Sequence, residues 1–240
     1  MISDVLSNAI RRLFDNCLQF AQQDCVLCGA GSGKELVCAA CRPELPRSPV
    51  PACPICAAPV ATAGHACGAC LKQPPAYDRA IAALSYSFPA DGLIQALKYR
   101  SQLPLSRLFA DLLCEAVSAA PRPDVLIALP LHPERARERG FNQATEIAKQ
   151  VARTLDIPLD TGSLARTRNT ASQAALPWEK RHKNVKGAFA CTDGVAGKHV
   201  ALLDDVMTSG ATLNEAAQTL KRAGAAEVSL WVVARAVPHH

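Results

Sequence analysis

From residue 80 onward, short apolar runs alternate with longer segments in which apolar residues recur every three or four positions. The short runs are rich in Ala, Val, Leu and Ile, as in buried strands, and they lie at 80–88, 124–130, 199–206 and 227–237. The longer segments have helical spacing and lie at 91–100, 104–119, 139–155 and 212–224. This alternation predicts an α/β fold with a mostly parallel sheet flanked by helices on both faces.

Residues 1–22 have a different pattern. Their apolar positions, among them Val5, Ile10 and Leu13, recur at helical spacing, but Arg11 and Arg12 interrupt them. The segment is therefore neither a signal peptide nor a membrane span, and we expect a cytoplasmic protein. We predict an amphipathic helix docked on the body of the protein, with a helix for a membrane surface or a partner as the alternative.

Proline-rich stretches interrupt the chain before the alternating region begins. The sequence LKQPPAYD marks a linker near residues 72–77, and 240 residues suffice for one larger domain and a small module. We predict an N-terminal helix over 1–22, a cysteine-rich module over 23–74 and an α/β domain over 77–240.

The cysteine-rich module holds eight of the eleven cysteines, arranged as four C-x-x-C pairs. Two such pairs can place four thiolates around one zinc ion, and a chain without a secretory signal is not expected to carry a disulfide framework. We predict two structural zinc sites, paired in chain order, with the metal supplying folding energy to a small double zinc ribbon. An interleaved pairing and the loss of one metal remain open. The ligands are Cys25, Cys28, Cys38 and Cys41 in the first site and Cys53, Cys56, Cys67 and Cys70 in the second.

The glycine-rich sequence GAGSGKEL at 29–36 resembles a phosphate-binding loop but lacks its chemistry. Its spacing is one residue short, and Glu35 stands where a Ser or Thr would hold magnesium. We predict that it forms the tip of a zinc-ribbon hairpin.

A second glycine-containing stretch, VALLDDVMTSGAT at 200–212, has stronger chemistry. An apolar strand ends at Asp204 and Asp205, and a loop of small and hydroxylic residues leads into the next helix. Backbone N–H groups around Gly210, together with the helix N-terminus, can bind a phosphate. The two acids can accept hydrogen bonds from a diol or bind a magnesium-coordinated one. A ribose 5-phosphate would satisfy both ends, whereas an acidic strand end that caps the next helix is the alternative.

The net charge of +5 matters only where it is concentrated. Residues 164–187 contain six basic residues and one acid, Glu179. The segment is either a basic surface strand or loop, or a groove for single-stranded nucleic acid with Trp178 as a stacking platform. The zinc module has few basic residues, which argues against DNA binding there.

Residue by residue, VALLDDVMTSGAT resembles the phosphoribosyl pyrophosphate motif of type I phosphoribosyltransferases. Together with the four C-x-x-C pairs, LIQALKYR and ALPLHPERARERGFNQA, it makes nearly the whole chain similar to the ComF family of competence and DNA-utilisation proteins, which includes proteins called GntX. The resemblance implies a type I phosphoribosyltransferase-like sheet with a small N-terminal zinc-ribbon module. It also implies that Asp204 and Asp205 contact the ribose hydroxyls. The 5-phosphate would be held by Thr208, Ser209, Gly210, Ala211 and Thr212.

The resemblance extends to the two remaining parts of such a site. The loop after the first sheet strand would bind pyrophosphate through Arg135, Arg139 and His132, although Glu134 and Glu138 also make a solvated helix start possible. The basic segment would carry a flexible loop that closes over the site. Its expected polar contacts are Gln173, Arg181 and Asn184.

Two functions follow from these patterns. The first is a phosphoribosyltransferase, in which magnesium and the loops hold phosphoribosyl pyrophosphate while an acceptor nitrogen displaces pyrophosphate. The family resemblance implies a role in DNA uptake or natural transformation, with a DNA helicase or another DNA-processing protein as partner. The alternative is a non-catalytic adaptor that senses nucleotides or binds single-stranded DNA. No residue pattern indicates the acceptor.

Overall fold

The computed structural model describes residues 23–169 and 184–236. Contacts within the chain divide it into two units, one that ends at Leu45 and one that begins at Pro46. The helix predicted for residues 1–22 lies outside the described residues. The predicted domain limits remain a prediction, but the second cysteine quartet belongs to the same unit as the sheet.

The first unit is built around a short antiparallel hairpin. Its strands are β1 (Gln23–Asp24) and β2 (Gly31–Gly33), which pair with each other. The glycine-rich sequence at 29–36 was predicted as the tip of a hairpin, and it lies in one, but Gly31–Gly33 form its second strand rather than its tip. Cys25 and Val37 are buried at 3% exposure, so the core of this unit is small.

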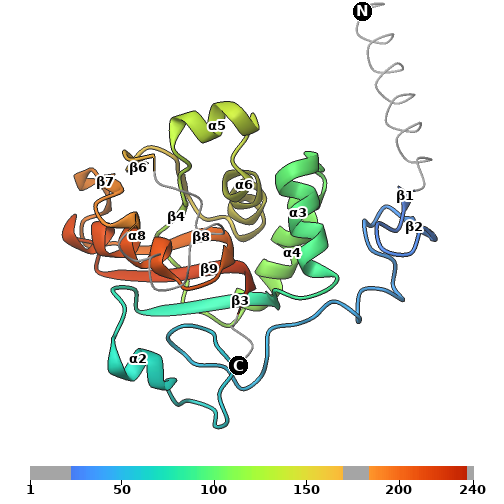
Figure 1. Cartoon of the computed structure of the whole chain (residues 1–240), viewed down its shortest axis with the longest axis horizontal. Coiled ribbons are helices and arrows are strands. Elements are labelled where there is room, and N and C mark those ends of the chain that lie inside the picture. The colour runs from blue at the N-terminus through green and yellow to red at the C-terminus, as the bar shows by residue number, and fades with distance from the viewer. Residues whose placement is uncertain (1–22, 170–183, 237–240) are drawn as a thin grey trace, which may run out of the picture. The chain divides into compact units, whose positions relative to one another are not determined.

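The second unit contains a five-stranded parallel sheet (Figure 1). Its order is β3-β9-β8-β4-β5, and each neighbouring pair is parallel. The strands are β3 (Arg79–Ser85), β4 (Val125–Ala128), β5 (Leu159–Asp160), β8 (His199–Met207) and β9 (Glu227–Arg235). The predicted parallel sheet is therefore confirmed. All carboxyl ends meet at one edge, where open parallel sheets bind their ligands.

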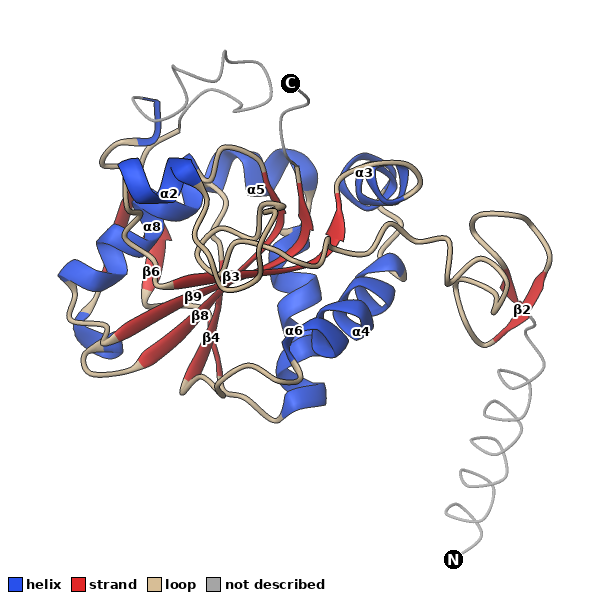
Figure 2. Ribbon diagram, turned by 90° about the horizontal axis from the view of Figure 1, so that it is seen from below, coloured by secondary structure: helices blue, strands red, loops and turns tan. Residues whose placement is uncertain are grey.

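Helices cover both faces of this sheet (Figure 2). They are α3 (Ala90–Arg100), α4 (Leu105–Val117), α6 (Gln143–Leu155) and α8 (Ala211–Arg222). Helix α4 packs on β3 and β9, α6 packs on β4 and β8, and α8 packs on β8 and β9. The helix expected over 139–155 begins only at Gln143. The chain reverses at Gly140 (φ +80°), and a separate short helix, α5 (Pro133–Arg139), precedes it.

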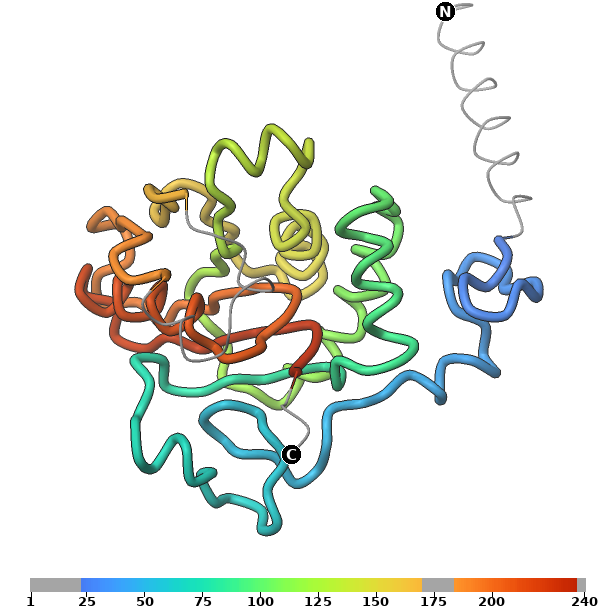
Figure 3. The backbone as a smooth tube through the Cα atoms, viewed as in Figure 1, coloured from blue at the N-terminus to red at the C-terminus, as the bar shows by residue number. Residues whose placement is uncertain are grey.

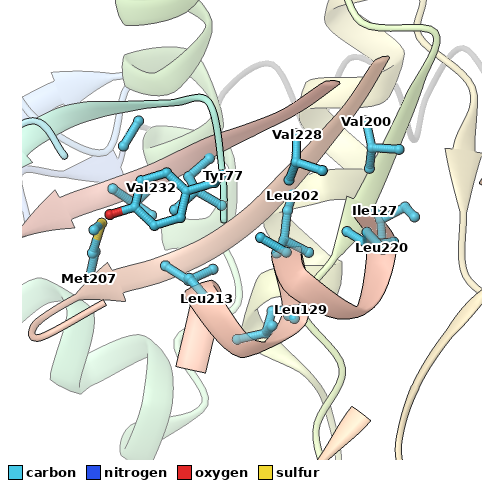
Figure 4. Close-up of a cluster of buried hydrophobic side chains, with 14 of the residues drawn as sticks. Tyr77, Ile127, Leu129, Val200, Leu202, Met207, Leu213, Leu220, Val228 and Val232 are labelled. Atoms are coloured by element: carbon cyan, nitrogen blue, oxygen red, sulfur yellow. The ribbon is translucent and has the colours of Figure 1, made fainter. Parts of the chain in front are cut away.

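The apolar residues of β8 are buried on both faces of the sheet. Side chains alternate along a strand, so Val200 and Leu202 lie on one face, where α8 contributes Leu213 and Leu220 to the same cluster (Figure 4). Ala201 and Leu203 lie on the opposite face and are fully buried. Strand β8 is thus a central strand whose carboxyl end is fixed by packing from both sides.

Smaller elements complete the second unit. A two-stranded antiparallel sheet joins β6 (Leu164–Arg166) to β7 (Phe189–Cys191), and a 3₁₀ turn, η3 (Asp193–Val195), follows. Residues 46–48 run along the edge strand β3, where Ser85 N donates to Pro46 O (2.7 Å) and Ser48 N donates to Ala83 O (3.0 Å). The second cysteine quartet follows and includes the short helix α2 (Gly68–Lys72). None of the described helices is both long enough and apolar enough to cross a membrane.

Candidate functional site

The acidic pair lies near the carboxyl end of β8, as the sequence indicates, but the two side chains differ. Because strand side chains alternate, Asp204 lies on the α8 face and Asp205 on the face covered by α3, α4 and α6. Asp205 is buried at 3% exposure and Asp204 is half-buried. Lys98 Nζ, from α3, lies 2.6 Å from Asp205 Oδ2. The resemblance implies that both acids contact the ribose hydroxyls, but the charge of Asp205 is already balanced by Lys98 within the protein.

These charges determine which groups remain ionised. Burial lowers the pKa of Lys98, but the charge and hydrogen bond of Asp205 and the charge of Asp204 together outweigh burial and hold that pKa above its ordinary value. Burial and the charge of Asp205 raise the pKa of Asp204 well above its usual range. The N–H of Asp205 donates to Asp204 Oδ1 at 2.9 Å and partly opposes this rise. Asp204 is therefore the acid of the pair that gains most from a ligand hydroxyl or a cation.

The loop after β8 has the geometry of an anion site. Gly210 adopts φ +75° and caps the N-terminus of α8, a helix of 12 residues with no acidic side chain in its first turn. A Cβ at Gly210 would lie 2.8 Å from Met207 Cε, so no other residue fits without a shift. Ser209 Oγ accepts a hydrogen bond from Ala211 N at 3.3 Å. The free N–H groups of a helix N-terminus and its dipole favour a phosphate here.

One cavity of about 480 Å³ brings these parts together. Its walls include Asp204, Asp205 and the entire loop from Thr208 to Thr212. Of the residues predicted to bind pyrophosphate, Arg135 and Arg139 line it. A single cavity thus holds the acids, the loop and two predicted arginines.

Three guanidinium groups form a cationic wall of this cavity: Arg135, Arg139 and Arg166. Burial and the charge of Arg135 lower the pKa of Arg166, while the charge of Asp204 raises it, so these charged groups are close enough to interact. Arg166 also lies over the ring of Phe189, 5.6 Å from its centroid. Like charges held together in a half-closed cavity favour a polyanionic ligand.

The segment predicted as the pyrophosphate loop is partly helical, which changes the role of His132. Helix α5 begins at Pro133, and His132 is its N-cap, with Nδ1 accepting from Glu134 N at 3.4 Å. His132 is not among the described residues that line the cavity. The alternative of a helix start is therefore correct for this segment, although Arg135 and Arg139 still reach the cavity from it.

The expected flexible loop is described only in part. Gln173, Arg181 and Trp178 lie outside the described residues. Asn184 is described, and it is not among the residues that line the cavity.

Several cavity residues were not predicted. Lys98 and Tyr99 come from α3, and Arg139 lies over the Tyr99 ring at 5.5 Å from its centroid. At the start of α6, Gln143 Oε1 accepts from Arg139 Nη1 at 2.6 Å, and Asn142 Nδ2 donates to Leu129 O at 3.0 Å. The available signal was the motif LIQALKYR, which contributed to the resemblance without a role for its lysine or tyrosine.

The eight cysteines of the module form two quartets in chain order. In each quartet the four Sγ atoms lie within 4.8 Å of one another. The Sγ atoms of Cys28 and Cys38 are 3.8 Å apart, and those of Cys56 and Cys67 are 3.5 Å apart. A tetrahedral zinc ion with Zn–S bonds of about 2.3 Å separates its sulfurs by about 3.8 Å. The donor sets and their geometry are therefore consistent with two structural zinc ions.

Both quartets also repeat one hydrogen bond that favours a thiolate. Cys38 N donates to Cys25 Sγ at 3.4 Å, and Cys67 N donates to Cys53 Sγ at 3.3 Å. Burial raises the pKa of Cys25, but backbone N–H groups outweigh burial and lower it to about 6; the same balance lowers the pKa of Cys53 to about 7. Metal binding requires the thiolate, so each site has one ligand already favoured in that form.

Comparison with known proteins agrees with both parts of the chain. A double zinc ribbon family model matches residues 18–71, and a phosphoribosyl transferase domain model matches residues 142–239. The DNA utilization protein YhgH of Salmonella typhimurium is 35% identical over 205 residues, which cover 83% of this chain and 90% of that protein. The competence protein F of Haemophilus influenzae is 34% identical over 212 residues, covering 85% and 92%. This chain belongs to the competence protein F (ComF) family.

One more distant relative agrees with this assignment. Competence protein ComFC of Bacillus subtilis is 28% identical over 217 residues, covering 84% of this chain and 85% of that protein. Among solved structures, a phosphoribosyltransferase from Corynebacterium diphtheriae shares 19% identity and a TM-score of 0.36, covering 62% of this chain and 93% of that one. The double zinc ribbon and the phosphoribosyltransferase-type domain are thus the two defining parts of this ComF-family chain.

Proposed function

We propose that this ComF-family chain binds phosphoribosyl pyrophosphate with Mg²⁺ and transfers its phosphoribosyl group to an acceptor nitrogen. One observation carries the proposal: a single cavity combines an acidic pair, a phosphate-type loop and a cationic wall. These three parts match, in kind, the ribose diol, the 5-phosphate and the pyrophosphate of that donor.

The 5-phosphate would bind at the N-terminus of α8. Gly210, in its left-handed conformation, lets the chain turn from β8 into the helix with no side chain in the way. The N–H groups that follow have no helical acceptor, so they can donate to phosphate oxygens. The hydroxyls of Thr208, Ser209 and Thr212 add donors at the same cavity.

The ribose would lie against Asp204. Asp205 is already ion-paired with Lys98, whereas Asp204 is half-buried at the cavity and has a raised pKa. Hydrogen bonds from the two ribose hydroxyls would stabilise the ionised form of Asp204 and offset its burial. Lys98 in turn engages Asp205 and leaves Asp204 as the acid that faces the ribose.

The pyrophosphate would face Arg135, Arg139 and Arg166. Guanidinium groups donate paired hydrogen bonds that suit diphosphate oxygens, and binding an anion relieves their mutual repulsion. A bound Mg²⁺ ion would neutralise further pyrophosphate charge and so make it a better leaving group.

In the transfer step, the bond between the anomeric carbon and the pyrophosphate oxygen breaks, and its electron pair leaves with pyrophosphate. The acceptor nitrogen supplies the electron pair for the new bond and loses one proton, which the departing pyrophosphate or solvent takes up. Positive charge develops on the ribose ring in between, beside the carboxylate of Asp204. The chain would contribute positioning and electrostatic stabilisation, and the acceptor has no assigned pocket.

The biological role is inferred from the relatives. Competence protein F and the DNA utilization proteins share most of their length with this chain. We therefore infer that the chain acts in the uptake or use of DNA, where phosphoribosyl transfer would act on a base or nucleotide.

Calorimetric titration tests the donor site directly. Phosphoribosyl pyrophosphate with Mg²⁺ should bind to the wild-type chain, and Asp204→Asn should abolish the heat of binding while leaving the zinc content unchanged. An Arg79→Lys variant serves as a matched control, because Arg79 pairs with Glu227 and is absent from the cavity wall. If the wild type shows no binding, the proposal is wrong. If it binds, pyrophosphate release with a panel of bases separates a transferase from a sensor.

A single-stranded DNA-binding adaptor is the second candidate. It is favoured by the basic segment, in which the exposed residues Arg168 and Lys186 are joined by a hydrogen bond from the Arg168 side chain to the Lys186 carbonyl. Affinity for a single strand should then fall steeply with salt and weaken in a combined Arg168→Gln, Lys186→Gln variant. Affinity that does not change with salt would exclude this role.

A further inference from the structure

Arg235, the last residue of β9, is a buried cation outside the cavity. Its side chain belongs to a residue only 8% exposed. Among the described residues, no carboxylate pairs with it, and its guanidinium instead donates to backbone carbonyls from three segments. A guanidinium carries five N–H donors in one rigid plane, so it can hold several segments in a fixed relation.

The guanidinium of Arg235 donates hydrogen bonds to the start of the phosphate-type loop. Nη1 donates to Met207 O at 3.0 Å and to Thr208 O at 2.5 Å. Ala236 N, next in the chain, also donates to Met207 O at 2.9 Å. The two carbonyls immediately precede Ser209 and Gly210, so Arg235 fixes where the loop begins.

The guanidinium of Arg235 also donates a hydrogen bond to the second cysteine quartet. Nε donates to the carbonyl oxygen of Cys56 at 2.9 Å, and Cys56 is one of the four ligand cysteines. The trace in Figure 3 shows the corresponding proximity: the end of β9, in red, lies beside the segment of the second quartet, in cyan. One side chain therefore bonds both to a zinc-ligand residue and to the loop.

Two further contacts join the same parts. Tyr77 is buried, its hydroxyl lies 3.7 Å from the position of a Cβ on Gly210, and it points toward Met207 in Figure 4. Burial, followed by the charges of Cys56 and Cys70, raises the pKa of Tyr77. Ala76 N donates to Asn214 Oδ1, in the first turn of α8, at 2.7 Å.

We propose that Arg235 is a positioning residue through which the second metal-binding quartet sets the geometry of the 5-phosphate loop. The quartet Cys53, Cys56, Cys67 and Cys70 then does more than fold a small module. With its metal bound, the Cys56 carbonyl is fixed, Arg235 is oriented, and the loop is held open for a phosphate. This inference rests on the proposed function, since it assigns the loop to the 5-phosphate.

Arg235→Lys tests the inference, because one ammonium keeps the charge but cannot donate in both directions at once. The probes are ribose 5-phosphate, which needs the loop, and magnesium pyrophosphate, which needs only the cationic wall. Ribose 5-phosphate should bind about tenfold more weakly, as expected for the loss of one charge-assisted hydrogen bond. Affinity for magnesium pyrophosphate and zinc content should not change. Arg79→Lys, at the amino end of β3, should alter neither affinity.

Matched cysteine variants provide a second test should Arg235→Lys fail to fold. Cys67→Ser and Cys38→Ser change equivalent positions of the two quartets, and each should remove one zinc ion. Only Cys67→Ser should weaken ribose 5-phosphate binding. Equal affinity in both variants, or equal losses for the two probes in Arg235→Lys, would overturn the inference while leaving the proposed function intact. Absence of ribose 5-phosphate binding in the wild type would overturn both.

Discussion

The ion pair between Lys98 and Asp205 offers the sharpest test of how the site is held together. Lys98→Met keeps most of the aliphatic length of the side chain but removes the Nζ atom that lies 2.6 Å from Asp205 Oδ2. The Asp205 side chain is 4% exposed, so water replaces the lost ammonium only poorly. The variant therefore leaves the carboxylate of Asp205 buried without the cation that pairs with it.

Two independent arguments give the magnitude. Removing one partner of a buried ion pair costs about 3–5 kcal/mol, because the remaining charge stays desolvated. Alternatively, the acidic pair can take up a proton on folding. At pH 7, protonating a carboxyl that titrates near about 3.9 in the unfolded chain costs about 4 kcal/mol, at ~1.4 kcal/mol per pH unit. We expect the variant to lose about 4 kcal/mol of unfolding free energy at pH 7.

The same argument fixes the pH dependence. The folded variant holds a proton that the unfolded chain releases above about pH 4. The stability of the variant therefore decreases as the pH rises above about 4. The difference from the wild type should shrink to about 1.5 kcal/mol at pH 5. Urea unfolding of the zinc-loaded protein at several pH values, followed by the fluorescence of the buried Trp231, measures this difference.

Two controls make the result interpretable. Lys221→Met removes a lysine at a similar distance from a carboxylate, 2.7 Å from Asp78 Oδ2, but Asp78 is 41% exposed, so we expect a loss of no more than about 1 kcal/mol. Adding Asp205→Asn to Lys98→Met should restore most of the lost stability, since the unpaired carboxylate of Asp205 is then removed. A loss below about 1 kcal/mol at pH 7 for Lys98→Met, or a loss that does not vary with pH, would refute the reasoning.

Three further predictions concern the loop, the acid and the metal. Gly210→Ala places a Cβ on a residue in the left-handed conformation, 2.8 Å from Met207 Cε, so thermal unfolding should show a loss of about 1–2 kcal/mol. Calorimetry should also show weaker binding of ribose 5-phosphate. Unchanged affinity would mean that the loop does not bind the phosphate. Burial and the charge of Asp205 raise the pKa of Asp204, so acidification should protonate Asp204 and weaken the binding of ribose 5-phosphate. Inorganic phosphate is the control, because its phosphate group also titrates but it has no ribose to contact Asp204. Equal losses of affinity for the two ligands on acidification would contradict this prediction. Elemental analysis of protein purified without chelator should give about two zinc ions per chain, and one ion would mean that a quartet does not bind zinc.

The fold was largely predictable because its strongest signals are local. The run from Val200 to Leu203 is apolar on both faces of a strand, and Gly210 marks the turn into the next helix. The cysteine spacing likewise specifies two quartets. Helix α5 was predicted only as an alternative because its seven residues contain no apolar periodicity, although Pro133 at its start and Gly140 after its end are its usual sequence signals.

The unpredicted parts of the site depend on contacts between distant residues. Lys98 lies on an amphipathic helix, and nothing in its local sequence indicates that it pairs with Asp205, more than a hundred positions later. Arg166 looked like one of several basic residues until β6 placed it in the cavity wall. Arg235 is the last residue of an apolar strand, and its role depends on carbonyl groups, which carry no sequence signal.

The strip of chain at residues 46–48 bears on how this protein can be shortened. It supplies hydrogen-bonding partners to Ala83 and Ser85 on the outer side of β3, an edge strand that would otherwise present unpaired backbone groups there. A fragment beginning at Pro46 retains these hydrogen bonds to β3 and the second quartet. A fragment cut at the apparent linker near residue 75 bares the strand edge and removes the Cys56 carbonyl from Arg235. Exposed strand edges can form hydrogen bonds with strands of other chains. The shorter fragment should therefore aggregate under conditions in which the longer one remains in solution.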